Sequence, residues 1–348
     1  MRRLRQIRDK SRTSLDGNPS NERGAATIVV AGLMVVLLGF AALAIDVGAL
    51  YAEKAQLQNG ADAAALAIAT DCANGNCGDS TATANSFANS NANDGSSGSA
   101  VSFPASTTVR VVTNARDDGS GANSFSLYFA RVLGMDTATV DAAAEAKWGA
   151  PNAATTLPWT VSECVFKKYL SPTQLASLNS TGNFSGDPTP THILLRYDEN
   201  APTMPGCAAQ NGYQPGGFGW LVTNAGCSTN VSVNATVNGQ TGNHFPNAAA
   251  CDAVLSTIMD EPALIPLFKT ATGNGSNAKY TLIGFAAFQV TGYKFSGSGA
   301  VLDPLAPNCS GNCRGLQGYF SRFVSLEEGS QIGGTVPNYG ASVVTLTD

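Results

Sequence analysis

The sequence predicts an α+β protein: an N-terminal single-pass transmembrane helix, extended into an amphipathic helix, followed by β-rich, disulfide-containing extracytoplasmic domains. Three observations predict this class: an uncharged apolar run near the N-terminus, helical periodicity that continues beyond it, and eight cysteines that all lie downstream. We expect four regions, which are a basic cytoplasmic tail (1–23), the helix with its extension (24–69), a linker with a small α+β module (70–149) and a β-rich domain (150–348).

The distribution of charge excludes one class of partner. The net charge of the chain is −5, but residues 1–23 carry seven basic and three acidic side chains, so the remainder has a net charge of −9. Phosphate backbones are bound by clustered positive charge. We therefore expect no nucleic-acid partner.

The apolar run fits a membrane. Between Arg23 and Asp46 lie 22 residues without a charge, and a helix of that length extends roughly 33 Å, close to the ~30 Å of a hydrocarbon core. We therefore expect residues 24–45 to span the membrane in contact with lipid. The basic flank precedes the run, so the N-terminus is predicted to be cytoplasmic and the C-terminus extracytoplasmic.

A cleaved signal peptide is the alternative for this run, because Ala42-Leu43-Ala44 resembles a cleavage site. However, apolar cores of signal peptides are typically about 7–15 residues long. Apolar residues also recur at helical spacing as far as about Ala69, before Asp71 and Gly75. An uncleaved anchor is the favoured interpretation.

Residues 22–69 resemble the N-terminal segment of TadG-like and TadE/TadG-related Flp (Tad) pilus-assembly proteins of the actinobacterial type. The shared residues are Arg23, Gly24, Asp46, Gly48, Gln58 and Asp62. The resemblance implies a structural or assembly component of a Tad pilus or related surface system, membrane-anchored and minor pilin-like, with other pilus or envelope assembly proteins as partners. Type IV-like prepilins carry Glu at the fifth position after the cleaved Gly, where this chain has Val29.

Two roles are open for parts of the helix. Small residues such as Gly24, Gly32 and Gly39 offer surfaces that a neighbouring apolar helix can approach closely. Asp46, at the exit from the membrane, is expected either to meet a basic group of a neighbouring subunit or simply to be hydrated.

Alternation and composition predict the elements that follow. In the third region we expect a loop and linker over 70–100, a strand over 101–113, a short amphipathic helix over 124–136 and a second strand over 137–148. In the fourth we expect strands over 192–197, 219–223, 280–294 and 318–326, and a helix over 248–259. Aromatic residues there, for instance Trp220, Tyr293 and Tyr319, support an alternative function as an anchored binding module for cell-wall carbohydrate or a surface ligand.

The cysteines are Cys72, Cys77, Cys164, Cys207, Cys227, Cys251, Cys309 and Cys313. An even count confined to the exported part favours disulfides formed in an oxidising compartment. Pairing of Cys72 with Cys77 and of Cys309 with Cys313 is the simplest arrangement, and three connectivities are open for the rest. The Cys309–Cys313 spacing also suits zinc, but no second close pair or nearby His completes four ligands.

Motifs for catalysis are missing from the sequence. Its two histidines, His192 and His244, accompany no Gly-x-Ser-x-Gly motif, and the adjacent carboxylates Asp260 and Glu261 point apart. The sequence also lacks a P-loop and an Asp-x-Ser-x-Ser metal site. The asparagine-rich segment before Asp94 resembles an EF-hand loop in spacing, but Asp94 stands where an EF-hand requires Gly. We expect no catalytic, cofactor-binding or metal-binding residue and no small-molecule substrate. An envelope hydrolase is the weakest alternative.

Overall fold

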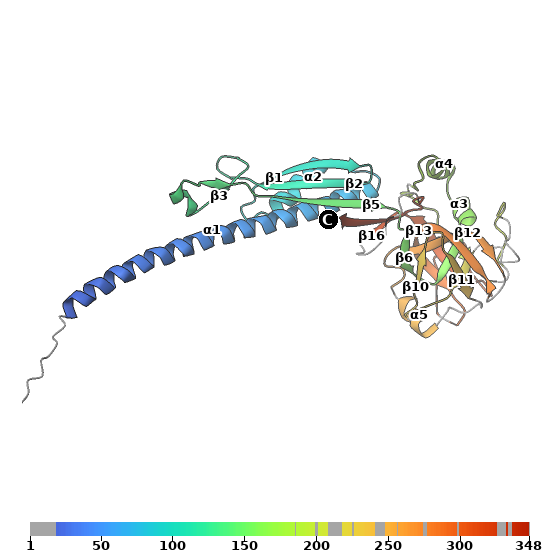
Figure 1. Cartoon of the computed structure of the whole chain (residues 1–348). Coiled ribbons are helices and arrows are strands. Elements are labelled where there is room, and N and C mark those ends of the chain that lie inside the picture. The colour runs from blue at the N-terminus through green and yellow to red at the C-terminus, as the bar shows by residue number, and fades with distance from the viewer. Residues whose placement is uncertain are drawn as a thin grey trace, which may run out of the picture.

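One long helix carries a small sheet along its second half, and a larger β-rich domain follows at the far end (Figure 1). This computed structural model describes residues 19–184, 186–198, 201–207, 218–224, 226–240, 248–255, 257–273, 277–297, 299–325, 332 and 336–347. The predicted fold class, an apolar N-terminal helix followed by β-rich domains with disulfides, is confirmed.

The helix α1 (Pro19–Ala73) has two halves with different surroundings. Its first half is exposed, and within Ala26–Ala73 the most apolar stretch has a mean hydropathy of 2.9 with no part buried, so by length and composition it qualifies as a membrane span. From Leu57 onward one face is buried, and Ala61, Ala64, Ala65 and Ile68 have no exposed surface. The helix predicted over 24–69 is confirmed and is a few residues longer at each end.

A five-stranded sheet packs on the second half of α1. Its order is β1-β2-β5-β17-β16, with every pair antiparallel except β16 and β17. The strands are β1 (Ser97–Ala105), β2 (Thr108–Ala115), β5 (Asp141–Gly149), β16 (Phe323–Ser325) and β17 (Ala341–Thr347). The last two come from the C-terminal part of the chain. The segment after residue 150 therefore contributes to both sheets.

Two expectations for residues 70–115 are corrected. The expected loop over 70–100 contains α2 (Ser80–Asn91), whose first turn is capped by the Asp79 side chain. Ala88 of α2 lies so close to α1 that a Cβ added to Gly60 would approach its Cα to 3.2 Å. The segment expected to be a single strand over 101–113 is instead the hairpin β1–β2. A two-residue turn preserves the alternation of side chains, so a hairpin and a single long strand show the same sequence pattern.

The helix expected over 124–136 is also wrong. This segment is a hairpin of β3 (Phe125–Ser126) and β4 (Thr137–Ala138) around the short 3-10 helix η1 (Ala130–Leu133). A contact with α1, described below, holds its backbone. The strand expected over 137–148 corresponds mainly to β5.

The second domain is built on an eight-stranded sheet with the order β11-β9-β7-β12-β13-β15-β8 and β14 paired to β13. A further pairing of β11 with β13 closes β11, β9, β7, β12 and β13 into a ring. The elements of this domain are β6 (Ala153–Thr156), β7 (Trp159–Ser162), α3 (Glu163–Lys168), α4 (Pro172–Thr181), β8 (Ile193–Arg196), β9 (Phe218–Leu221), β10 (Thr229–Ser232), β11 (Thr236–Gln240), α5 (Ala248–Leu255), β12 (Ala263–Thr272), β13 (Lys279–Lys294), β14 (Ala300–Val301) and β15 (Gly315–Ser321).

The predicted strands 192–197, 219–223 and 280–294 are confirmed as β8, β9 and β13, and the helix 248–259 as the shorter α5. The strand expected over 318–326 is corrected to two strands, β15 and β16, which meet at Arg322 and belong to different sheets. Aromatic rings fill the core of this domain, with Phe166 in edge-to-face contact with Phe184, Phe320 and Tyr339.

Candidate membrane and assembly surface

The first half of α1 presents an apolar surface without a partner in the described chain. Its large side chains are mostly more than half exposed, and they are Ile28, Val29, Val30, Leu33, Met34, Val35, Val36, Leu37, Leu38, Phe40, Leu43, Ile45 and Val47. Contiguous apolar surface of this extent marks a membrane or protein contact. Cβ atoms added at Gly24, Gly32, Gly39 and Gly48 meet nothing within 4 Å, so these positions are open.

Asp46 ends this apolar surface and is almost completely buried, with 3% of its surface exposed. Its Oδ1 accepts hydrogen bonds from the backbone N–H of Tyr128 (2.8 Å) and Phe129 (3.2 Å). Its Oδ2 accepts from the N–H of Phe129 (3.0 Å) and Ala130 (2.6 Å). The carboxylate therefore caps η1 from a different helix, taking the place of the side-chain cap that η1 lacks.

The ionised form of Asp46 is stabilised by these donors. Burial alone would raise the pKa of Asp46, but the backbone N–H groups of Ala130, Tyr128 and Phe129 outweigh it, with help from Arg131, and lower that pKa below its usual value. The expected roles in hydration or in pairing with a neighbouring subunit are replaced by a contact within the chain. Both segments are recognisable in the sequence, but no feature of the sequence indicates that they meet.

Two other residues that carry the resemblance, Gln58 and Asp62, lie on the packed half of α1, whereas Gly24 and Gly48 are among the open positions named above. Gln58 Nε2 donates to Asp62 Oδ1 (2.8 Å) and to the carbonyl oxygen of Ala143 on β5 (3.2 Å). Gln58 and Asp62 line an open groove of about 370 Å³ together with Arg110. Gln58 therefore connects the helix to the sheet, and Asp62 accepts a hydrogen bond from the same amide. The side chain of Arg23 lies outside the described residues.

All eight cysteines form disulfides: Cys72–Cys77, Cys164–Cys207, Cys227–Cys251 and Cys309–Cys313. The two local pairs are those that spacing favoured, and the structure selects one of the three open connectivities. The first disulfide lies at the end of α1, and the other three lie in the second domain. An apolar helix together with these disulfides indicates a membrane-anchored protein with extracytoplasmic domains.

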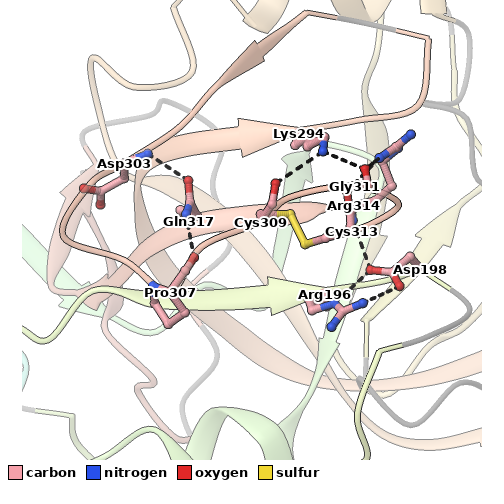
Figure 2. The surroundings of a disulfide bond; sticks show 10 residues. All are labelled: Arg196, Asp198, Lys294, Asp303, Pro307, Cys309, Gly311, Cys313, Arg314 and Gln317. Carbon is pink, nitrogen blue, oxygen red and sulfur yellow. Dashed lines mark hydrogen bonds and ion pairs between the residues drawn. A yellow bond between two sulfur atoms is a disulfide. The ribbon is translucent and has the colours of Figure 1, made fainter.

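The Cys309–Cys313 loop is fixed by a network of polar contacts (Figure 2). Lys294 Nζ donates to the carbonyl oxygens of Cys309 (3.3 Å) and Gly311 (2.8 Å). On the other side of the loop, the Asp198 carboxylate accepts a hydrogen bond from the backbone N–H of Arg314 (3.0 Å). The same carboxylate forms a bidentate ion pair with the Arg196 guanidinium, with N–O distances of 2.6 and 2.9 Å. These contacts attach the loop to β8 and β13.

Asp303 is the centre of a second cluster of hydrogen-bonded polar groups, which was not predicted from the sequence. Its Oδ2 lies 2.5 Å from His192 Nδ1 and accepts the Thr291 hydroxyl, and its Oδ1 accepts the N–H of Leu305 (2.8 Å). Burial would raise the pKa of Asp303, but the Thr291 hydroxyl, His192 and the Leu305 N–H outweigh it and lower that pKa.

This cluster does not have the geometry of a nucleophilic triad. The Thr291 hydroxyl faces the carboxylate of Asp303 instead of the ring of His192, whereas a triad needs its hydroxyl on the base. Among the residues that the structure describes, no group of three His, Cys, Asp or Glu side chains could hold a metal ion. His244, the second histidine, lies outside the described residues.

The aromatic residues considered for carbohydrate binding are mostly in the core. Trp220 is 3% exposed, and its ring packs against Trp159 and Phe295. Tyr293 is also buried and stacks on Phe295. Only Tyr319 is partly exposed, against the ring of His192. Two of the three rings therefore fill the core.

Part of α1 matches a known protein family. Residues 24–71 match the model of a family described as putative Flp pilus-assembly TadE/G-like. No curated protein and no solved structure matches the chain. The matched stretch covers the exposed apolar half of α1, Asp46, and the half that packs on the sheet. Residues 24–71 of this chain are thus a TadE/G-like region of the Flp pilus-assembly type.

Proposed function

We propose that the chain is a membrane-anchored, non-catalytic component of a Tad/Flp-type pilus or a related cell-surface system, either as a minor pilin-like subunit or as an assembly factor. One observation carries the proposal: the family match coincides with a helix that is bare and apolar before Asp46 and packed on a sheet from Leu57 onward. Such a helix can insert in lipid while its second half holds a folded domain outside.

The orientation follows from charge and chemistry. Seven basic residues precede the apolar run, and positively charged flanks stay in the cytoplasm. Every disulfide lies after it, as expected of domains in an oxidising compartment. We therefore assign the N-terminus to the cytoplasm and both sheets to the exterior.

The partners that fit the bare half of α1 are lipid and other apolar helices of the assembly. Gly24, Gly32 and Gly39 have no neighbouring atoms within 4 Å of an added Cβ, so another helix can approach the span closely at these positions.

Fractionation of piliated cells tests the proposal. A C-terminally tagged chain is expressed in the cells, and sheared filaments, membranes and medium are blotted for the tag. Tag in the filaments supports a pilin-like role, and tag in membranes supports an assembly factor. Tag free in the medium, on a chain that begins near residue 46, would overturn the membrane anchor.

Two leucine substitutions sharpen this test. Leu37→Arg places a charge in the span, at a cost of about 2.5–3.5 kcal/mol, so we expect the chain to leave the membrane and filaments to be lost. Leu305→Arg, at a similarly exposed leucine of the second domain, should leave both unchanged. Normal filaments in cells that lack the chain would refute a role in the pilus.

A further inference from the structure

A second apolar surface lies beside the exit of the membrane helix. The tip of the β3–β4 hairpin, residues 128–135, is here named the exit loop. Its exposed apolar side chains are Tyr128, Phe129, Val132, Leu133 and Met135, of which Val132 is 85% and Leu133 74% exposed. Five such side chains in eight residues are unusual for a turn in water. The remaining surface of the small sheet module has few comparable residues among those described, mainly Phe87, Phe103 and Leu346.

The position of the exit loop along α1 is fixed by Asp46. Three consecutive backbone N–H groups of the loop donate to this carboxylate, at distances of 2.6 to 3.2 Å. Asp46 is the first charged residue after the uncharged run. The hairpin also reaches back along α1, away from the second domain, in Figure 1. The loop therefore lies at the level where the span ends.

The loop is also held in shape. Leu127 N–H donates to the Asp136 carbonyl oxygen (2.9 Å), and the Arg131 guanidinium folds back to donate to the Leu127 carbonyl oxygen (3.0 and 2.7 Å). Gly134 ends η1 with a φ of 83°, a left-handed conformation that favours glycine. A fixed turn displays its apolar side chains without losing much further conformational entropy.

We propose that the exit loop inserts into the interfacial region of the same bilayer that α1 crosses, and so forms a second membrane contact. This proposal rests on the proposed membrane anchoring of α1. Its composition suits that depth, because aromatic side chains prefer the boundary between headgroups and acyl chains. Val132 and Leu133 extend the contact into the acyl chains, while the exposed charges of Arg131 and Asp136 remain among the headgroups.

Continuity favours lipid as the occupant over a second subunit. The exit loop and the end of the span are joined within one chain, so the bilayer that covers α1 reaches the loop without any further partner. One contact alone leaves the exterior module free to tilt about the helix. Two contacts separated across the membrane surface restrict that tilt and orient the sheet relative to the bilayer.

Depth-dependent fluorescence quenching in proteoliposomes tests the proposal with the full chain. The native tryptophans, Trp148, Trp159 and Trp220, all lie in the sheets, away from the exit loop. A Val132→Trp variant adds one indole at a highly exposed position, where no core packing is disturbed. We expect lipids brominated near the headgroups to quench the added emission strongly, and lipids brominated near the chain ends to quench it weakly.

Two further variants separate the possible failures. Leu37→Trp reports on the middle of the span and should be quenched best by the deeper bromines; if it is not, the membrane anchor itself fails. Leu305→Trp, exposed in the second domain, should not be quenched at any depth. Quenching at Leu37→Trp without quenching at Val132→Trp would overturn the exit-loop proposal alone.

The same samples test the competing occupant and the role of Asp46. A blue-shifted Val132→Trp emission that no bromine quenches, and that depends on the protein-to-lipid ratio, would place the loop against a second copy and overturn the lipid assignment. In the Val132→Trp background, Asp46→Ala removes the acceptor for the loop and should reduce the shallow quenching. Unchanged quenching would contradict the positioning role of Asp46.

Discussion

Arg322 donates a hydrogen bond from its guanidinium to the carbonyl oxygen of Ala73, the last residue of α1. This side chain stands between β15 and β16, at the point where the chain passes from the second sheet to the first. It also lines an opening of about 590 Å³ between the helix end and the second domain. One cation thus satisfies a helix terminus and joins the two parts of the exterior.

Replacing Arg322 should loosen this junction. Arg322→Met leaves the Ala73 carbonyl without its donor, and we expect a loss of about 2 kcal/mol in the free energy of unfolding, measured by chemical denaturation in detergent. Arg110→Met is the control, since Arg110 forms only a half-exposed ion pair with Glu145 at 3.6 Å and should cost less than about 1 kcal/mol. Equal effects of the two changes would contradict the role of Arg322.

Asp303 should make the second domain sensitive to acid. Because its pKa is lowered in the folded protein, its contribution to stability is complete above the unfolded value near 3.8 and is lost as pH falls through the lower folded value. Asp303→Asn should cost about 2 kcal/mol at pH 7 and progressively less below pH 4. Denaturation at a series of pH values measures this, with the exposed Asp260→Asn as the control.

Glu53 should have the opposite pH dependence. Burial, and then the negative charge of Asp94, raise the pKa of Glu53. Its ionisation therefore opposes folding, and this contribution appears as pH rises from the unfolded value through the higher folded value. Glu53→Gln should raise the melting temperature at pH 7 and change it less at pH 4. A lower melting temperature at pH 7 would show that Glu53 has a stabilising partner.

The disulfides should differ in how much they stabilise the fold, according to the length of the loop that each one closes. Cys164 and Cys207 are separated by 43 residues, for which chain entropy gives about 4 kcal/mol, whereas Cys309 and Cys313 are separated by 4, for which it gives about 2 kcal/mol. Paired Cys→Ala substitutions, followed by denaturation of each variant, compare the two. A larger loss from the Cys309–Cys313 pair would show that the polar network around that loop outweighs chain entropy.

Two alanines of α1 should respond differently to added volume. Ala65 has no exposed surface and faces the sheet, so Ala65→Leu should cost about 1–3 kcal/mol by overpacking. Ala41 is exposed on the apolar half, and Ala41→Leu should leave stability unchanged within about 0.5 kcal/mol. Equal stability of the two variants would place the sheet elsewhere on the helix.

The sequence predicted the elements whose signal is local. An uncharged run and helical spacing define α1, and a long apolar alternation defines β13. By contrast, α2 consists largely of Ser, Thr, Asn and Ala, which are weak or neutral for helix formation apart from Ala, and it is stabilised by the Asp79 cap and by close packing on Gly60. Neither feature is visible in apolar periodicity.

The candidate site divides in the same way. The apolar surface and the cysteines could be predicted because each depends on residue type alone. The hydrogen bonds from residues 128–130 to Asp46 could not be predicted, because the two segments are separated by more than 80 residues. The apolar residues of the loop are also spaced as they would be in a helix. Likewise, the pairing of His192 with Asp303 depends on how β8 and the loop after β14 come together in space.

Strand β17 lies between β5 and β16, so the sheet that packs on α1 is completed by a strand from the C-terminal part of the sequence. In a chain that is made from its N-terminus, β1, β2 and β5 emerge long before β17. The second domain, inserted between them, therefore emerges and can acquire its disulfides while the first sheet still lacks its partner strands. Until β17 is in place, β5 has no neighbour on one side and presents an open strand edge beside α1, where another unfolded chain can pair.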